Sequence, residues 1–184
     1  MIPAGARTSF AGSQLRYNLL ERTPERELLP QARAFDQAVP AWAPLAAGKL
    51  TGKHLRGESG RLGAAGGTCD PREETVVKAV VEIAEQGGWS PAQVAPASLL
   101  GRPGNVVPIV AATKESRLAG NLGAVGVRLD ADAVARLDEV SAVPLGFPHD
   151  FVREPRVTRT VYGDRWAGID ERRSTYRRTA HDVL

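Results

Sequence analysis

The sequence predicts an α/β fold whose strands run parallel. Short apolar runs bounded by polar residues, glycine or proline alternate along the chain with stretches of helical periodicity. Capping signals mark where several of the helices begin. Strands that alternate with helices pair in parallel through right-handed crossovers, and three such strands can be found in these 184 residues. A closed barrel of eight strand and helix units needs about 250 residues, so the sequence fits a small α/β domain or a piece of something larger.

The first helix lies between the first two strands. Residues 14–20 (QLRYNLL) have the character of a strand and residues 25–35 that of a helix. Residues 39–45 (VPAWAPL) form a short apolar run with proline near each end, which is typical of a buried strand that leads into a loop. Residues 46–69 hold many glycines and no apolar period, so we expect a long surface loop, of the kind that is usually functional or mobile.

Two helices follow this loop. Asp70 is placed as an N-cap, with Glu73 three residues later as the second half of a capping box. Residues 90–93 repeat this start signal for a helix that continues to Leu100, in which Pro96 removes a backbone donor and predicts a kink or an early end. The apolar stripe of the first of these helices consists of Val76, Val80, Ile83 and Ala84, before Gly87 and Gly88 end it.

The last elements complete the alternation. Residues 105–112 (NVVPIVAA) predict a buried strand and residues 114–122 the helix after it. Residues 129–140 predict a further helix capped by Asp130, and the side chains expected to face inward are Val134, Leu137 and Val140. The predicted order is strand, helix, strand, loop, helix, helix, strand, helix, helix.

The net charge of +3 comes from the end of the chain. Residues 151–184 hold eight arginines and five acids, whereas the first 150 residues hold sixteen basic and sixteen acidic residues. Arginines alternate with Tyr162, Trp166 and Tyr176, a mixture that can serve phosphate contact and base stacking. The five acids interrupt the positive charge of the tail, and the first 150 residues carry no net charge. Both weaken the electrostatic attraction that nucleic-acid binding needs. We therefore predict a basic, partly ordered tail and no nucleic-acid partner.

Composition also argues against a membrane protein and a metal site. No apolar stretch approaches the roughly 18 residues that span a bilayer, and residues 1–12, an irregular segment, lack the apolar centre of a signal peptide. We expect a cytoplasmic protein with no membrane partner. The single cysteine, Cys69, excludes an internal disulfide, and the histidines lie in three separate segments, so no metal site is predicted.

Better candidates for chemistry follow the predicted strands, because parallel α/β folds bind ligands at the carboxyl ends of their strands. Trp42, near the end of the second strand, could offer its ring to an aromatic ligand or fill the core. Arg117 and Asn121 are four residues apart and share one face of a helix. An arginine near a helix N-terminus suits a phosphate, and a solvated helix face without a ligand is the alternative.

Four segments resemble, in order and spacing, the C-terminal half of an aldo/keto reductase. They are residues 14–22 (QLRYNLLER), 39–53 (VPAWAPLAAGKLTGK), 106–122 (VVPIVAATKESRLAGNL) and 129–140 (LDADAVARLDEV). The resemblance covers roughly residues 13–150. It implies that the three strands are the sixth to eighth of a (β/α)8 TIM barrel, that NADP or, less favoured, NAD is the hydride carrier, and that carbonyl compounds are the substrates.

The resemblance also implies a set of cofactor contacts. Gln14 would hydrogen-bond the nicotinamide carboxamide, and Trp42 would stack on the nicotinamide. The loop after the second strand would pass over the pyrophosphate, and the end of the third strand with its helix would meet the adenosine phosphate and the adenine. An arginine at a 2′-phosphate would favour NADP. The implied cofactor-binding residues are Gln14, Trp42, Ala43, Leu45, Gly48, Leu50, Lys53, Ala111, Ala112, Thr113, Arg117 and Asn121.

Several positions depart from the family pattern. Ala111 replaces a usual glycine, Gly120 replaces an acid before the helix asparagine, and Pro96 and Ser98 interrupt an apolar helical stretch. The family's catalytic Asp, Tyr, Lys and His belong to its first four strands, and no tyrosine here matches the catalytic motif. The resemblance therefore implies no catalytic residue in this sequence.

Three functional interpretations stay open. The chain could be the NADP-binding half of a carbonyl reductase, inactive alone and active with a polypeptide that supplies the N-terminal half-barrel. It could instead be a non-catalytic nucleotide-binding or regulatory module, or a degenerate gene fragment. Three parallel strands leave two open edges, so we expect self-association or poor solubility unless another polypeptide completes the sheet.

Overall fold

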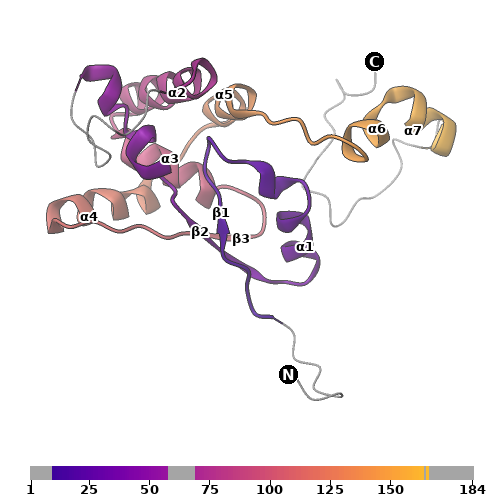
Figure 1. Ribbon diagram of the computed structural model, residues 1–184, viewed down its shortest axis with the longest axis horizontal. Coiled ribbons are helices and arrows are strands. Elements are labelled where there is room, and N and C mark those ends of the chain that lie inside the picture. The colour runs from indigo at the N-terminus through magenta and orange to yellow at the C-terminus, as the bar shows by residue number, and fades with distance from the viewer. Residues whose placement is uncertain (1–9, 58–68, 164, 166–184) are drawn as a thin grey trace.

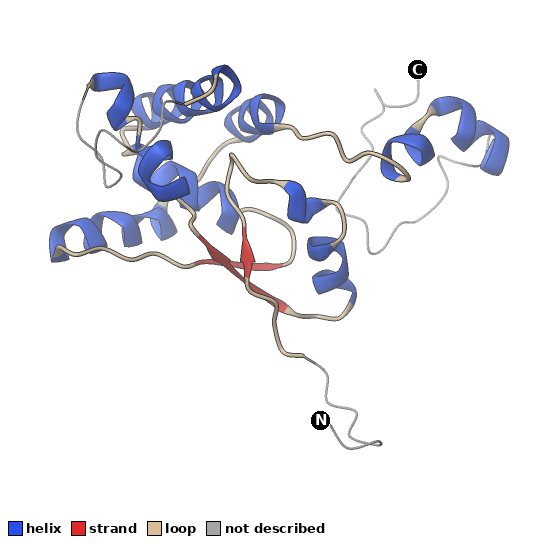
Figure 2. Ribbon diagram, in the orientation of Figure 1, coloured by secondary structure: helices blue, strands red, loops and turns tan. Residues whose placement is uncertain are grey.

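The protein is described by a computed structural model that places residues 10–57, 69–163 and 165. Its centre is a three-stranded parallel sheet in the order β1-β2-β3 (Figures 1 and 2). Leu15 of β1 lies opposite Ala41 of β2, and Ala41 lies opposite Pro108 of β3. The strands are β1 (Leu15–Arg16), β2 (Ala38–Trp42) and β3 (Asn105–Pro108).

Helices follow each strand, in the order that the sequence predicts. The α-helices are α1 (Leu28–Ala34), α2 (Pro71–Gly87), α3 (Pro91–Leu100), α4 (Glu115–Leu122), α5 (Ala131–Ser141), α6 (His149–Arg153) and α7 (Pro155–Tyr162). Short 3₁₀ helices are η1 (Thr23–Glu25), η2 (Ala46–Thr51), η3 (Lys53–Arg56) and η5 (Gly123–Gly126). The parallel pairing and the alternation of strands with helices are thereby confirmed.

The strands are shorter than predicted. β1 holds two residues, because Asn18 turns the chain: its Oδ1 accepts hydrogen bonds from the backbone N–H groups of Leu20 and Glu21, at 2.9 and 3.0 Å. β2 stops at Trp42, since the next residue has a left-handed backbone. β3 stops at Pro108, before the expected end at residue 112: one more hydrogen bond follows, from the N–H of Ile109 to the carbonyl oxygen of Ala41 at 2.8 Å, and β2 itself ends at Trp42.

The expected surface loop over residues 46–69 is wrong for its first part. Residues 46–56 form η2 and η3, and Leu50 is completely buried against α2 and α3. Ala46 of η2 is buried in the same cluster, so this part of the glycine-rich segment packs on the core. Residues 58–68 lie outside the described part of the chain.

The predicted helix starts are confirmed. Asp70 and Ser90 each form a capping box, and the Asp130 carboxylate accepts a hydrogen bond from the backbone N–H of Ala133 at 2.8 Å. Pro96 does not shorten α3, which reaches Leu100, since Pro96 packs in the interior where burial outweighs the lost backbone donor.

One inward-facing side chain of α5 was predicted wrongly. Leu137 is 1% exposed, but Val134 is 41% exposed. The contact between α5 and the core runs through Ala133, Leu137 and Val140, so Val134 lies at the margin of this face.

The core consists of two main clusters. One joins α2, α3, α5 and η2, and the other lies where α1 and α3 cover one face of the sheet (Figure 1). The side chains that the sheet contributes to the second cluster alternate along the strands, as the pleat requires. They are Leu15, Tyr17, Val39, Ala41 and Val106. The residues between them point to the other face, where Trp42, Val107 and Ile109 are exposed.

The first described residues pair with the sheet earlier than expected, and the last ones form helices. Pairing with the sheet begins inside the segment expected to be irregular, because Gly12 forms a bridge to Ala38. A Cβ at Gly12 would lie 2.8 Å from the carbonyl oxygen of Ala38, so only glycine fits there. At the other end, the predicted tail holds the end of α6 and all of α7, and its residues Trp166 and Tyr176 lie outside the described part. No described helix is both long and apolar enough to cross a membrane.

Candidate cofactor site

The exposed face of the sheet, here called the open face, holds the first two predicted site residues. Trp42 ends β2 and is 43% exposed, and the register places Arg16 of β1 directly beside it. The guanidinium carbon of Arg16 lies 5.7 Å from the centroid of the Trp42 ring, within range of a cation–π contact. Gln14 is also exposed, and the alternation of β1 places it on the same face as Arg16. The question whether Trp42 fills the core is thus answered: it does not.

The backbone that follows Trp42 is strained. Ala43, Ala46 and Ala47 have φ angles of 54°, 47° and 57°, in the left-handed region that residues with a Cβ rarely adopt. Gly48 follows with φ 99°. Such conformations each cost about 1 to 3 kcal/mol and cluster at ligand-binding loops, where the surrounding structure maintains them. The strain makes this loop a candidate binding element independently of its sequence.

The predicted residues of this loop differ in what they can offer. Leu50 is completely buried, so its side chain belongs to the core and only its backbone is available to a ligand. Leu45, Gly48 and Lys53 are half-buried. The neighbouring Lys49 is occupied, since its Nζ lies 2.6 and 2.7 Å from the two carboxylate oxygens of Glu73 at the start of α2. This ion pair fastens the loop to α2.

The third group of predicted residues follows β3. Ala111 and Thr113 are exposed and Ala112 is half-buried, on the segment that leads into α4. The last two predicted residues lie on α4 and differ in burial: Arg117 is exposed, whereas Asn121 is buried. Within the described residues no carboxylate pairs with Arg117, so its charge is available to an anion.

Sequence reasoning missed Asn18, which holds two of these segments together. Its side chain is fully buried, and its Nδ2 donates a hydrogen bond of 3.0 Å to the carbonyl oxygen of Ala43, the first strained residue after β2. Its Oδ1 caps the turn after β1. Asparagine after a strand is a turn signal, which could have indicated the local role. The long-range contact to Ala43 has no sequence signal.

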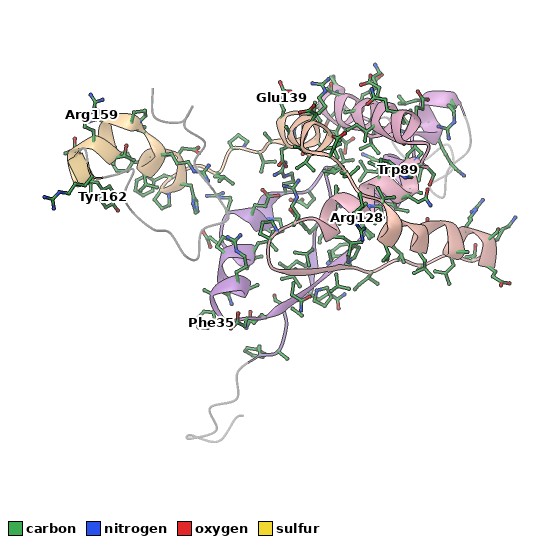
Figure 3. All side chains as sticks on the ribbon, turned by 180° about the vertical axis from the view of Figure 1, so that it is seen from behind. Phe35, Trp89, Arg128, Glu139, Arg159 and Tyr162 are labelled. Atoms are coloured by element: carbon green, nitrogen blue, oxygen red, sulfur yellow. The ribbon has the colours of Figure 1, made fainter. Side chains whose placement is uncertain are left out.

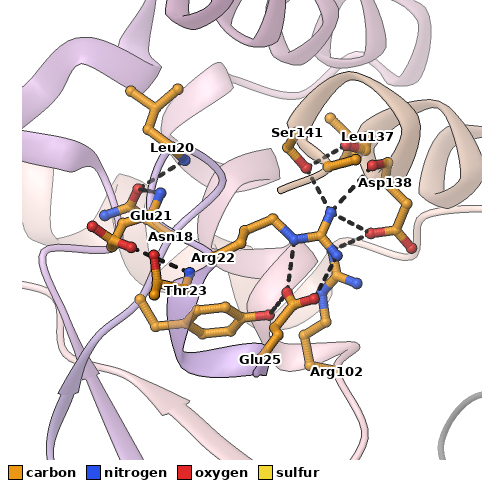
Figure 4. Close-up of polar contacts among 12 residues, drawn as sticks. Asn18, Leu20, Glu21, Arg22, Thr23, Glu25, Arg102, Leu137, Asp138 and Ser141 are labelled. Atoms are coloured by element: carbon orange, nitrogen blue, oxygen red, sulfur yellow. Dashed lines mark hydrogen bonds and ion pairs between the residues drawn. The ribbon is translucent and has the colours of Figure 1, made fainter. Parts of the chain in front are cut away.

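A buried polar cluster lies on the covered side of β1 (Figure 4). Arg22 contacts both carboxylate oxygens of Glu25, at 2.7 and 2.9 Å, in the bidentate geometry that makes such pairs strong. It also donates to Ser141 at 2.7 Å and forms a 2.9 Å ion pair with Asp138, both of α5. Arg102 makes a second ion pair with Asp138, at 2.6 Å. The cluster joins the segment after β1 to α5 and to the turn before β3.

Burial and charge shift the pKa of several groups. Desolvation by burial, together with a 2.6 Å hydrogen bond to Glu25, raises the pKa of Tyr17 well above its ordinary value of 10.0. Burial lowers the pKa of Arg22, but the hydrogen bond and charge of Glu25 more than offset this, and the pKa of Arg22 is raised. Burial and the charge of Glu73 raise the pKa of Cys69, which disfavours the reactive thiolate.

A cavity of about 760 Å³ lies on the covered side, between α1, α3, η5 and α5. Figure 3 shows this part of the molecule from behind, with Arg128 labelled. Members of the polar cluster line the cavity together with apolar side chains such as Val125 and Val134. No predicted cofactor residue lines it. In the described residues, no three histidine, cysteine or acidic side chains come together as metal ligands.

Comparison with known proteins agrees with this fold. The chain is 32% identical over 133 residues to the uncharacterized oxidoreductase YrpG of Bacillus subtilis (strain 168), covering 72% of this chain and 41% of that protein. It is 34% identical over 151 residues to the aldo-keto reductase ausK of Emericella nidulans, covering 78% of this chain and 38% of that protein. The chain thus spans about two fifths of the length of these relatives.

Solved structures lead to the same fold. The thermostable aldo-keto reductase Tm1743, solved with the inhibitor epalrestat, superimposes with a TM-score of 0.54 at 24% identity, covering 73% of this chain and 41% of that one. The sequence profile described as the Aldo/keto reductase family matches residues 4–142. That match takes in most of the chain, with the sheet, the open face and α5, and the protein therefore belongs to the aldo/keto reductase family.

Proposed function

We propose that this chain is the C-terminal, NADP-binding half of an aldo/keto reductase barrel, over roughly residues 13–150. In this proposal β1, β2 and β3 are the sixth, seventh and eighth strands of the (β/α)8 barrel. The half-barrel is inactive alone. It acts in the NADPH-dependent reduction of aldehydes or ketones when another polypeptide supplies the N-terminal half.

The observation that carries the proposal is the open face. Parallel sheets are normally covered on both faces, but here Trp42, Val107 and Ile109 are exposed opposite the helix-covered face. Within the described residues, β1 and β3 each pair with β2 alone, so both edges of the sheet can accept a further strand. An uncovered face between two unpaired edges is what a segment of a barrel presents before the remaining strands close it.

The residues of the open face and of the loop after β2 fit a nicotinamide dinucleotide. Trp42 presents an exposed ring at the carboxyl end of β2, and Gln14 presents an exposed amide on the same face. Asn18 and the Lys49–Glu73 ion pair hold the strained loop between them. Arg117 offers the charge-assisted hydrogen bonds that a 2′-phosphate needs, which favours NADP over NAD. When bound, NADPH supplies the hydride for the carbonyl carbon.

The tyrosines of the described part support the proposed lack of activity alone. Carbonyl reduction needs a proton donor at the carbonyl oxygen, and such an acid contributes about 10² to 10⁴ in rate. Tyr17 is buried on the covered side, donates a hydrogen bond to Glu25, and has a raised pKa. Tyr162 lies on α7, far along the chain from the sheet. The proton donor is therefore expected from the other half-barrel.

Co-expression tests the proposal. The chain is produced alone and together with the part of a relative such as YrpG that this chain does not match, which the proposal takes to be the N-terminal half-barrel. NADPH oxidation is then measured with a panel of aldehydes. We expect turnover only in the mixture. Trp42→Ala should lower the rate of NADPH oxidation in the mixture at least tenfold. Turnover by the chain alone overturns the proposal. An inert mixture together with tight NADPH binding by the lone chain favours the non-catalytic nucleotide-binding module instead.

A further inference from the structure

We propose that Arg16 makes the site discriminate between the two redox states of the cofactor, favouring the reduced form. This inference rests on the proposed function, because it takes Trp42 as the residue on which the nicotinamide stacks. The resemblance to the family implies no role for Arg16. The structure assigns it one through its position beside Trp42.

The first step is the place of the guanidinium. Arg16 and Trp42 are paired in the register of β1 and β2, and alternation directs both side chains to the open face. The guanidinium lies over the ring of Trp42, with its carbon 5.7 Å from the ring centroid. One face of the ring is therefore occupied by a cation, and the proposal places the nicotinamide on the other face, for which Trp42 leaves room at 43% exposure.

The second step is that this charge is not neutralised nearby. Among the described residues no carboxylate forms an ion pair with Arg16. Arg22, six positions along, shows the opposite situation, with two acidic partners within 2.9 Å. Arg16 is exposed, so its positive charge lies on the open face with no paired carboxylate among the described residues.

The third step is the charge of the ligand. The nicotinamide ring is cationic in NADP⁺ and neutral in NADPH, and the two molecules carry the same phosphates. The centroids of stacked rings lie about 4.5 to 7 Å apart, so the guanidinium and the nicotinamide ring would be about 10 to 13 Å apart. At effective dielectric constants of about 80 to 20, Coulomb repulsion over about 10 Å weakens NADP⁺ binding by about 2-fold to 15-fold, with no matching effect on NADPH. Arg16 also competes with a pyridinium cation for the same π electrons.

Calorimetric titration of the lone chain with NADPH and NADP⁺ tests the inference without any catalytic activity. Arg16→Met removes the charge and keeps the length of the side chain, and it should tighten NADP⁺ binding by 2-fold or more while NADPH binding changes less. Arg16→Lys keeps the charge and should preserve the wild-type affinity ratio. Arg117→Met is the matched control, since it should weaken both ligands equally.

The outcomes separate the two proposals. If the wild-type chain binds both cofactor forms and Arg16→Met leaves their affinity ratio unchanged, the role of Arg16 is overturned and the NADP site stands. If the wild-type chain binds neither form, the NADP site itself is overturned, and the inference falls with it. A melting curve of each variant shows whether it is folded.

Discussion

The two faces of the sheet differ in what they do for the protein. On the covered face, Tyr17, Val39 and Val106 are buried under α1 and α3, and Tyr17 joins the polar cluster. On the open face, Arg16 and Trp42 are exposed and contact each other. Because side chains alternate along a strand, the same short strands hold the fold with one set of residues and present a candidate site with the other. Stability and ligand binding should therefore be separable by mutation at adjacent positions.

The largest expected difference between the faces concerns two arginines. Arg22→Met leaves the largely buried Glu25 carboxylate without its cation, whereas Asp138 keeps its 2.6 Å ion pair with Arg102, and breaking a buried ion pair costs about 3 to 5 kcal/mol. Arg16→Met removes an exposed side chain and should change the free energy of unfolding by no more than about 0.5 kcal/mol. Urea unfolding of both variants measures the difference.

A double variant sharpens this first prediction. Arg22→Met combined with Glu25→Gln removes both charges of the pair, so it should be more stable than Arg22→Met alone. If the double variant is instead less stable, by the sum of the two separate losses, the two charges do not act as a pair.

Neighbouring valines on β3 provide a comparison free of charge effects. Val106 is 6% exposed on the covered face and Val107 is 48% exposed on the open face. Val106→Ala removes buried methyl groups and leaves a cavity, at a cost of about 2 kcal/mol. Val107→Ala should cost less than about 0.5 kcal/mol. Equal losses at the two positions, measured by thermal unfolding, would mean that the open face is covered in solution, for example by a second copy of the chain.

Alkaline pH should act on the covered face through Tyr17. Its folded-state pKa lies well above 10.0, so above that pH the unfolded chain releases the phenolic proton while the folded chain keeps it. The unfolded state then binds fewer protons, and the free energy of unfolding falls by about 1.4 kcal/mol per pH unit. Below pH 10 this contribution is fully present. Tyr17→Phe should unfold with a shallower dependence on pH above 10, and an unchanged slope would assign the alkaline loss to other groups.

Much of the fold could be predicted from local sequence. The capping boxes at Asp70 and Ser90 place helix starts by hydrogen bonds within four residues, so the sequence contains all the participants. The order of strands and helices followed from apolar runs. Strand lengths did not, because the end of a strand depends on its neighbour: β3 makes one last hydrogen bond to β2, from Ile109 to Ala41, and β2 then ends at Trp42. The length of a strand therefore depends on the whole sheet and cannot be predicted from the residues of that strand alone.

The site is less predictable for the same reason. Asn18 acts on Ala43 across 25 positions, and Arg22 acts on Ser141 across 119. Nothing in the neighbourhood of either residue indicates its partner. The family resemblance selected Trp42 by position but not Arg16, whose importance depends on strand register. The resemblance also selected Leu50, whose side chain is in the core.

The smallest expected effect concerns the strained loop beside the open face. Ala47 has φ 57° and is exposed, and the left-handed region costs a residue with a Cβ about 1 to 2 kcal/mol. Ala47→Gly removes that strain but gives the unfolded chain more freedom, worth about 0.4 to 1 kcal/mol, so a net gain of about 0.5 kcal/mol is expected. Gly48 is the reciprocal control: a Cβ there would meet nothing within 4 Å, so the loss expected for Gly48→Ala, about 1 kcal/mol, comes from the backbone alone. Urea midpoints that move in opposite directions for these two variants would establish that the loop stores backbone strain. A loss of stability in Ala47→Gly would contradict it, and would leave close packing of the Ala47 methyl group as the reason for alanine at this position.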